Sequence, residues 1–441
     1  MVRSQERALT APLDRRRDDI RTILRAAMGV VSPDRLIGRA LADPDLAREI
    51  ARRPVHLLAV GKAAPPMADA WLRHAAPPKD GLVIGTHRGK ADLRSLRWRQ
   101  GGHPIPNEQS VSAGREALDF ARSLGEHECL VVLLSGGASA AMAAPLGNLS
   151  IADKQATVTA LLAAGADITG LNTVRKHLSA IKGGRLAAAC AGTTWTLAVS
   201  DVVGDDAAVI GSGPTVPDAS TFADAQRVLE TLGVASQLPL SVRAVIEAGL
   251  RGAVEESVKP GDPRVARAEW RMIGGRREAM AGAKEAAEKL GYRVLIMDEP
   301  VVGDARQAAR SHVEQLRSSL TLVGRPACVV SSGETTVKVT GNGIGGRNQE
   351  FVLSAATSLI GFPSGVTIAS AGTDGIDGPT NAAGAIADDR SIERARAGGL
   401  PEAADYFARN DSYHFFAALD DLIVTGPTDT NVGDVQVVLI P

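Results

Sequence analysis

Residues 341–350, with the sequence Gly-Asn-Gly-Ile-Gly-Gly-Arg-Asn-Gln-Glu, combine the residue types best suited to binding an anion. A strand-like run at 335–340 precedes them, and an apolar, helix-like run at 351–359 follows. Glycine N–H groups at a helix N-terminus favour negative charge, so Gly345 and Gly346 are predicted to bind phosphate. Arg347 adds a planar cation suited to carboxylate or phosphate, and we expect Asn348 to bind substrate beside it.

Small residues also follow an apolar run at 129–134, where a strand is expected to turn into a helix. Their backbone can approach phosphate oxygens closely, although a plain tight turn is the alternative. The predicted phosphate-binding residues of this turn are Ser135, Gly136, Gly137 and Ser139. Lys62 follows a further apolar run at 55–60 and could act as a point charge in a cleft, or be an ordinary exposed lysine.

Carboxylates follow two other predicted strands. Asp201 and Asp205 come after the run at 196–199 and suit Mg²⁺, a hard ion that prefers oxygen ligands, while helix capping is the alternative for Asp205. Asp374 lies in a glycine-rich loop at 370–378, where it could bind Mg²⁺ or accept a proton from a substrate hydroxyl. Basic residues at 172–177 and 182–185 form a patch without an assigned role.

The glycines at 341, 343 and 346 also have the G-x-G-x-x-G spacing of a dinucleotide site. That site needs an acidic residue about 20 positions further on for the ribose. The positions around 365–367 hold no acid, and Asp374 comes too late. Glycine loops, separated cations and carboxylates after strands are instead the groups that phosphoryl transfer requires. The sequence therefore favours phosphoryl transfer over hydride transfer.

The elements that must position these residues are apolar strands alternating with helices. Such alternation is typical of parallel sheets covered by helices on both faces, which bind ligands beyond the carboxyl ends of the strands. At 441 residues the chain is long enough for two domains. A polar, proline-containing segment at 254–268 is predicted to link them, with domains at 14–255 and 266–441.

Composition excludes several classes of protein. The formal net charge of −1 provides no basic surplus for nucleic acid. The three cysteines are far apart in the sequence, which excludes a disulfide framework. The sequence contains neither an apolar run of membrane-spanning length nor a secretory leader, so we expect a cytoplasmic protein without a membrane segment.

Seven segments together resemble motifs of the class II glycerate kinases. They are 134–139, 172–177, 200–205, 211–215, 345–350, 372–380 and 425–432. The second half resembles the MOFRL-type domain of that family, and the first half its Rossmann-like N-terminal domain. The resemblance spans about residues 18–440 in order.

The resemblance implies an ATP- and Mg²⁺-dependent kinase that converts D-glycerate, most often to 2-phosphoglycerate. It implies two three-layer α/β/α domains around an active-site cleft, with Lys62 and Arg347 as the key cations. We further expect Asp374 to be the catalytic carboxylate, and Asp201 and Asp205 to carry Mg²⁺. Two alternatives stay open: an NAD(P)H-dependent hydroxypyruvate reductase, a label this family often carries, and a non-catalytic sugar-acid sensor. A homodimer is compatible with the sequence.

Overall fold

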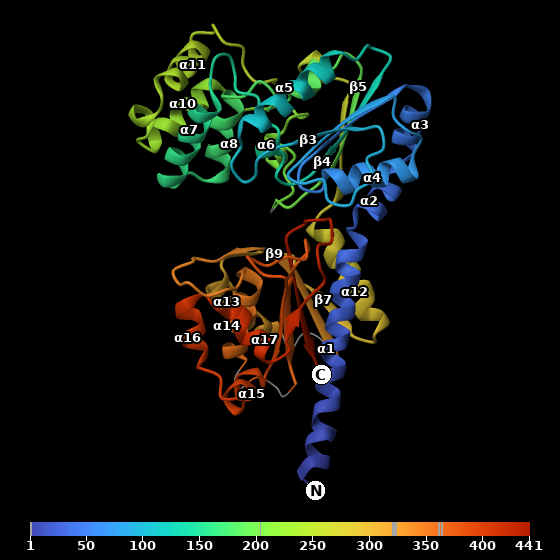
Figure 1. The fold of residues 1–441 in the computed structure, drawn as a ribbon, viewed down its shortest axis with the longest axis vertical. Helices are drawn as coiled ribbons and strands as arrows, with labels where there is room; N and C mark the ends of the chain where they lie inside the picture. The colour runs from blue at the N-terminus through green and yellow to red at the C-terminus, as the bar shows by residue number, and fades with distance from the viewer. Residues whose placement is uncertain (1, 203, 320–323, 360–361, 363–364) are drawn as a thin grey trace. The chain divides into compact units, whose positions relative to one another are not determined.

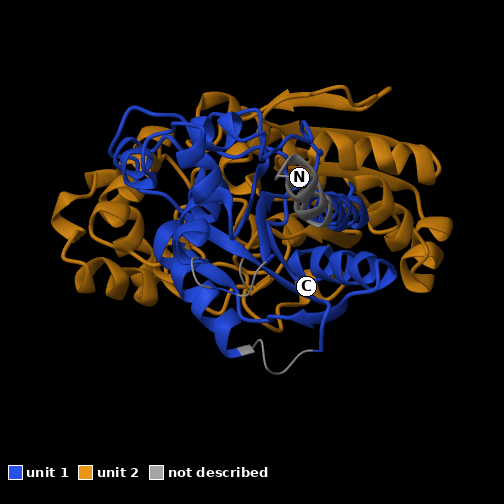
Figure 2. Cartoon of the chain, turned by 90° about the horizontal axis from the view of Figure 1, so that it is seen from below, with its two compact units in different colours: residues 1–32, 274–441 blue, residues 33–273 orange. Residues whose placement is uncertain are grey.

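The computed structural model describes residues 2–202, 204–319, 324–359, 362 and 365–441 (Figure 1). The chain forms two compact units: unit 2 comprises residues 33–273, and unit 1 comprises residues 1–32 and 274–441 (Figure 2). Each unit has its own sheet and is considered by itself. No helix in the described ranges is both long enough and apolar enough to cross a bilayer.

Unit 2 contains a six-stranded sheet in the order β3-β2-β1-β4-β5-β6. The pairs β1–β2, β1–β4, β2–β3 and β4–β5 are parallel. The strands are β1 (Val55–Val60), β2 (Asp80–Gly85), β3 (Arg97–Gln100), β4 (Cys129–Leu134), β5 (Thr193–Val199) and β6 (Ala268–Gly274). Every residue of β4 and β5 is buried, as expected for strands covered on both faces.

Helices cover both faces of this sheet. Helix α4 (Ala64–His74) packs on β1 and β2 and buries Trp71, while α2 (Pro33–Leu41) packs on α4. Alanines of α5 (Glu108–Arg122) pack against the alternate strand residues Leu58, Val60 and Leu130. The remaining helices here are α3 (Pro44–Arg52), α6 (Ala138–Ala141) and α9 (Arg185–Ala189).

A separate helical subdomain of unit 2 has its own apolar core. It consists of α7 (Ile151–Ala163), α8 (Ile168–His177), α10 (Phe222–Thr231) and α11 (Leu240–Leu250). Leu161, Val174, Phe222 and Ile246 meet in this core. Ser150 caps α7 by accepting from the backbone N–H of Asp153, and Thr221 caps α10 in the same way. The first of these caps fixes the start of α7, which carries the buried Lys154.

Unit 1 contains a mixed sheet in the order β12-β11-β10-β13-β9-β7, with β8 also paired to β9. The strand β13 runs antiparallel to both β9 and β10. The strands are β7 (Arg293–Ile296), β8 (Val301–Asp304), β9 (Ala327–Thr336), β10 (Thr367–Gly372), β11 (Gly384–Asp388), β12 (Leu422–Ile423) and β13 (Asp434–Ile440). Parallel pairing was expected, and it holds for the four described pairs of the first sheet. In the second sheet only β7 and β8 pair in parallel with β9 among the pairs described.

Helices also cover both faces of the second sheet, as Figure 1 shows. Helices α1 (Val2–Val30) and α12 (Arg276–Lys289) pack together and contact β13, while α13 (Ala305–Ser319) and α14 (Arg347–Ser358) lie on the opposite face. Three short helices, α15 (Ser391–Ala397), α16 (Ala403–Arg409) and α17 (Ser412–Ala418), complete the α14 side. The predicted three-layer α/β class is confirmed for both units.

The segment predicted as a linker, 254–268, is packed into unit 2. Ser257 and Val258 are buried. The Glu256 carboxylate contacts His177 Nε2 at 3.0 Å and accepts from the backbone N–H of Phe222 at 2.9 Å. Polar composition indicated a solvated linker, but these polar side chains satisfy buried partners instead. The units accordingly change at 32–33 and 273–274, whereas the predicted domain limits were 14–255 and 266–441.

Candidate active site

Three neighbouring strand ends of unit 2 bring together residues that are far apart in the sequence. Lys62 follows β1, Ser135 follows β4, and Asp201 follows β5. These strands are adjacent and parallel, so their carboxyl ends lie at one edge. The backbone N–H of Lys62 donates to Gly136 O at 2.8 Å, and that of Ala63 donates to Ser135 Oγ at 3.1 Å. The turns after β1 and β4 are therefore joined into one surface.

Glycine is required at two positions of this surface. A Cβ on Gly136 would collide with the Asp201 carboxylate, which places Asp201 directly against the predicted phosphate loop. Gly137 has a φ of 82°, and a Cβ there would lie 3.1 Å from Lys62 Cγ and 3.0 Å from His103 Cδ2. The left-handed backbone and the close approach both favour glycine. Lys62, the 135–137 turn and Asp201 thus lie together at one edge of the sheet.

The ring of His103 also lies over this surface. Partial desolvation of the ring lowers the pKa of His103, and the positive charge of Lys62 lowers it further. A neutral imidazole beside the lysine can accept or donate a hydrogen bond at neutral pH. Its position at this edge could not be inferred from spacing, because His103 lies in a loop after the edge strand β3.

Ser139, the last predicted residue of the phosphate loop, is surrounded by cations. Lys182 Nζ donates to Ser139 Oγ at 2.6 Å, and Arg175 Nη2 donates to the same oxygen. The basic patch at 172–177 thus divides into different roles. Arg175 reaches the loop, whereas Lys176 forms an ion pair with Asp218 at 3.2 Å.

The residues predicted to carry Mg²⁺ meet part of what that ion requires. Asp205 has one buried carboxylate oxygen, Oδ1, without a hydrogen-bond partner in the described ranges. Within those ranges no three His, Cys, Asp or Glu groups assemble into a metal centre. Mg²⁺ usually keeps waters and uses only one or two carboxylates together with substrate phosphates. Asp201, which lies against the phosphate loop, and Asp205, with its unpartnered oxygen, each offer an oxygen ligand of the kind that Mg²⁺ takes. Val203, between them in the sequence, lies outside the described residues.

The second candidate group lies where strands of the unit 1 sheet end. Arg347, the first residue of α14, donates from Nε and Nη2 to the two carboxylate oxygens of Asp434, at 2.8 and 2.9 Å. Its Nη1 donates to Glu334 Oε1 at 2.7 Å. The Asp434 side chain is fully buried, and the two acids, Asp434 above all, raise the pKa of Arg347 against the opposing effect of burial. The predicted substrate cation is therefore held by two carboxylates.

The N-terminus of α14, predicted to face a phosphate, is capped by a carboxylate of the chain. Asp377 accepts from the backbone N–H groups of Asn348 at 3.0 Å and Gln349 at 2.8 Å. A Cβ on Gly346 would collide with Asp377, which explains the glycine. Burial raises the pKa of Asp377 to about 6, and repulsion from Asp434 adds to this rise. The anion at this helix end is thus supplied internally.

Asn348 connects the two acids at this edge. Its Nδ2 donates to Asp434 Oδ1 at 3.0 Å and to Asp377 Oδ1 at 3.3 Å, and its Oδ1 accepts from Ser370 Oγ. Asn348 is buried, so these contacts occupy its amide group. Asp374, the predicted base, is half-buried in the loop after β10, where its Oδ1 accepts from the backbone N–H of Ile376. We call Glu334, Asp374, Asp377 and Asp434 the acidic edge.

The glycines before α14 pack against another loop of unit 1. The strand β9 ends at Thr336, so most of the strand-like run at 335–340 is irregular. Asn410 Oδ1 accepts from the backbone N–H groups of Thr340 and Gly341, at 2.8 and 2.9 Å. A Cβ on Gly341 would collide with the backbone of Arg409. Alternation favoured a longer strand, but contacts from about 70 residues away fix a loop instead.

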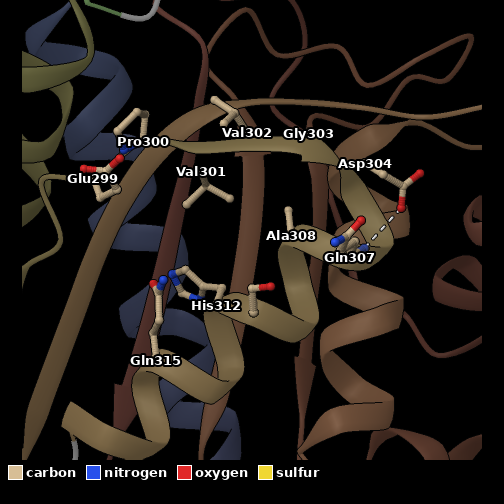
Figure 3. A pocket seen from close by; sticks show the side chains of 11 residues that line it. Glu299, Pro300, Val301, Val302, Gly303, Asp304, Gln307, Ala308, His312 and Gln315 are labelled. Carbon is tan, nitrogen blue, oxygen red and sulfur yellow. Dashed lines mark hydrogen bonds between the residues drawn. The ribbon is translucent and has the colours of Figure 1, made fainter.

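A buried polar chain links this edge to a cavity of about 320 Å³ between β8 and α13 (Figure 3). From Asn348 and Ser370 it continues through Gln436 and Ser331 to His312 Nε2, at 2.9 Å from Ser331 Oγ. Burial lowers the pKa of His312 to about 4, so the imidazole is neutral. The cavity is lined by residues 299–304, 307, 308, 311, 312 and 315 and includes none of the predicted site residues.

Comparison with known proteins places this geometry in a family. A model described as a domain of unknown function (DUF4147) matches residues 19–247, and the MOFRL family model matches residues 327–434. D-glycerate 2-kinase of Thermotoga maritima is 37% identical over 424 residues, which cover 95% of this chain and 97% of the relative. A putative hydroxypyruvate reductase of Agrobacterium vitis is 39% identical over 414 residues, covering 91% and 92%.

A solved structure agrees with the sequence matches. The crystal structure of glycerate kinase from Thermotoga maritima matches with a TM-score of 0.87 at 35% identity, covering 97% of this chain and all of that one. Fold and matches together define a two-unit α/β enzyme of the kinase class. The chain belongs to the glycerate kinase family in which a DUF4147 domain precedes a MOFRL domain. The resemblance seen in the sequence is thereby confirmed.

Proposed function

We propose that the protein transfers the γ-phosphoryl group of ATP to the C2 hydroxyl of D-glycerate, forming 2-phosphoglycerate and ADP. The observation that carries this proposal is the unit 2 edge, where Lys62, the 135–139 turn and Asp201 come together at three neighbouring strand ends. A glycine turn with adjacent cations suits phosphate oxygens. Full-length relatives named glycerate 2-kinase support the same substrate.

The reductase alternative fits the glycine run at 341–346 poorly. A dinucleotide pyrophosphate would need free N–H groups at the start of α14. Those of Asn348 and Gln349 already donate to Asp377, whose carboxylate would repel a pyrophosphate. The same contact disfavours the predicted phosphate binding by Gly345 and Gly346. We therefore assign the phosphates to Ser135, Gly136, Gly137 and Ser139.

The chemistry divides among the residues as follows. The C2 oxygen of glycerate bonds to the γ-phosphorus while the bond to the β,γ-bridging oxygen breaks, and ADP leaves. In our proposal Asp374 accepts the hydroxyl proton, and Lys62 and Arg347 bind the substrate carboxylate and offset charge on the transferring group. Three of the five N–H groups of Arg347 donate to Asp434 and Glu334. These bonds fix the orientation of the guanidinium group, whose other two N–H groups are the ones that would donate to substrate.

Mg²⁺, when bound, would neutralise charge on the β- and γ-phosphate oxygens. Asp201 and Asp205 are the residues that would hold it, because Asp201 lies against the phosphate loop and Asp205 has an unpartnered buried oxygen. Asn348 acts differently: both ends of its amide are engaged by Asp434, Asp377 and Ser370. We propose that it positions these acids beside the substrate.

The proposal is tested by identifying products. The purified protein is incubated with D-glycerate, ATP and Mg²⁺, and in parallel with hydroxypyruvate and NADH or NADPH. We expect ADP and 2-phosphoglycerate from the first mixture and no oxidation of the reduced nucleotide in the second. Oxidised nucleotide without phosphoglycerate would show that the protein is a hydroxypyruvate reductase. If neither mixture gave a product, the non-catalytic sugar-acid sensor would be the remaining alternative.

Replacing Lys62 by alanine tests the assignment of the unit 2 edge. The loss of one preorganised cation should lower turnover on the order of 10²–10³-fold. Lys90→Ala is the matched control, because Lys90 is an exposed lysine of unit 2. Equal activity of the Lys62 and Lys90 variants would remove Lys62 from the mechanism without removing the kinase activity itself.

A further inference from the structure

Three basic residues of unit 2 lie near one another without a negatively charged partner in the described ranges. Lys182 Nζ donates to Ser139 Oγ at 2.6 Å and to Ser139 O at 3.0 Å, and Arg175 Nη2 donates to the same hydroxyl oxygen. Lys154 Nζ is buried on α7, which packs on the α8 helix of Arg175, and has no hydrogen-bond partner in the described ranges. We call Lys154, Arg175 and Lys182 the cation cluster.

The hydrogen-bond directions around Ser139 follow from these donors. Both lone pairs of Ser139 Oγ accept from cations, so its proton is donated to Ser212 Oγ at 3.0 Å. Ser212 in turn donates to Asn172 Oδ1 at 3.0 Å, which also accepts from Arg175 Nη1. Asn172 Nδ2 is buried and has no partner within the described ranges. The network therefore ends in an unsatisfied donor, Asn172 Nδ2, and Lys154 Nζ is a second buried donor without a partner in the described ranges.

The acceptors around the cluster are all neutral. Within the described ranges, none of the three cations forms a salt bridge, whereas the adjacent Lys176 pairs with Asp218. A buried charge without an opposite charge is costly, and natural proteins pair such charges or use them to bind ions. Three basic side chains without an opposite charge and the free amide nitrogen of Asn172 are the groups that an anion-binding site provides.

We propose that the cation cluster, with Asn172 and Ser139, is a subsite for the phosphate oxygens of the phosphate-bearing ligand of the reaction. A phosphate group brings several acceptor oxygens and more than one negative charge, which matches three basic side chains and the free Asn172 amide better than a single carboxylate does. The subsite continues the turn after β4. The identity of the ligand rests on the proposed kinase function, but the binding of phosphate itself does not.

The pKa values of the two lysines agree with a site built for an anion. Burial, then the charges of Arg175 on α8 and Arg185 on α9, lower the pKa of Lys154 to about 7. Burial, then the charges of Arg175 and Lys154, lower the pKa of Lys182 well below its usual value. A bound anion reverses this effect because it stabilises the ammonium forms. Phosphate binding should therefore be accompanied by proton uptake.

Calorimetry on the full chain tests the proposal, with inorganic tripolyphosphate as the probe. We expect the wild type to bind it and to take up protons at pH 8, measured from the heats in Hepes and in Tris buffers. Arg175→Met and Lys182→Met should each weaken binding tenfold or more, and Lys182→Met should reduce the proton uptake. Lys90→Met, an exposed lysine of the same unit, should change neither quantity.

Parallel titrations with ADP and with 2-phosphoglycerate identify the source of the phosphate. A loss confined to ADP assigns the subsite to the nucleotide, and a loss confined to 2-phosphoglycerate assigns it to the acid product. Thermal unfolding verifies that each variant is folded. Lys154→Met gives a second test, since a neutral side chain of similar length keeps the packing while removing a charge. Undiminished tripolyphosphate affinity in all three folded variants would overturn the proposal, even if the enzyme is a glycerate kinase.

Discussion

The site edges of the two sheets differ in charge: within the described residues, basic side chains without carboxylate partners lie at the unit 2 edge, and carboxylates predominate at the unit 1 edge. At the unit 2 edge, Arg175 and Lys182 donate to the neutral Ser139 hydroxyl, and Lys154 has no partner in the described ranges. At the acidic edge of unit 1, Arg347 is held by Asp434 and Glu334. A cation held by the chain's own carboxylates is already positioned, whereas a buried cation without an opposite charge is costly. This difference supports our proposal that unit 2 binds phosphate and unit 1 supplies the acid–base chemistry.

Arg347→Ala should have the largest effect, because it removes both a substrate contact and the partner of a buried acid. We expect turnover to fall at least on the order of 10²–10³-fold. Unfolding free energy should fall by about 3–5 kcal/mol, since Asp434 is fully buried and would be left unpaired. Denaturant unfolding and steady-state kinetics measure the two effects.

Combining Arg347→Ala with Asp434→Asn separates the effect on turnover from the effect on unfolding free energy. The amide removes the unpaired charge, so most of the stability should return while the activity does not. If stability and activity returned together, Arg347 would be a structural residue and the contrast between the two edges would lose its functional meaning.

Asp377→Asn should change how stability depends on pH. The folded pKa, about 6, is raised above the reference value of 3.8, so the folded state holds the proton to higher pH than the unfolded state. This group therefore adds stability as pH falls from about 7 through 6 towards 4, by at most about 3 kcal/mol. Asparagine can still cap α14 but does not titrate.

The measurement is the difference in unfolding free energy between wild type and Asp377→Asn across that pH range, because other carboxylates cancel in the difference. The relative stability of the wild type should increase towards low pH. A constant difference would mean that Asp377 is not held in the raised-pKa environment that the acidic edge provides.

Lys154→Met should have the smallest of these effects and the opposite sign. Replacing an unpaired buried charge by a well-packed apolar side chain is neutral or stabilising, by about 1–2 kcal/mol at pH 6, where Lys154 is charged. The gain should shrink above pH 7 as the wild-type lysine becomes neutral. Denaturant titrations at pH 6 and pH 8.5, with Lys90→Met as control, measure it; a loss of stability would show that Lys154 has a stabilising partner.

The sequence was most informative where local pattern determines structure. The apolar runs at 55–60 and 129–134 became β1 and β4 with the predicted bounds, because fully buried parallel strands are continuous apolar segments. Lys62, the 135–139 turn and Asp201 directly follow apolar runs, so the sequence places them at strand ends. They became candidates for ligand binding because ligands bind at the carboxyl ends of parallel strands. Adjacency of β1, β4 and β5 then brought these residues together.

Long-range contacts accounted for what the sequence did not reveal. Asp434 begins an antiparallel strand, so its place beside Arg347 depends on β13 lying between β9 and β10. Asp377 reaches the start of α14 from about 30 residues away. Nothing in the sequence around Lys154 indicates burial, and only the packing of α7 on α8 shows that it is buried near Arg175.

The most direct test of the contrast between the edges is the dissociation constant of tripolyphosphate for Lys182→Met and for Asp374→Asn, measured by calorimetry at one pH. The account predicts that Lys182→Met weakens binding tenfold or more. It predicts that Asp374→Asn binds tripolyphosphate at least as tightly as wild type while failing to phosphorylate D-glycerate. Weakened binding in Asp374→Asn together with unchanged binding in Lys182→Met would contradict the division of roles between the two units.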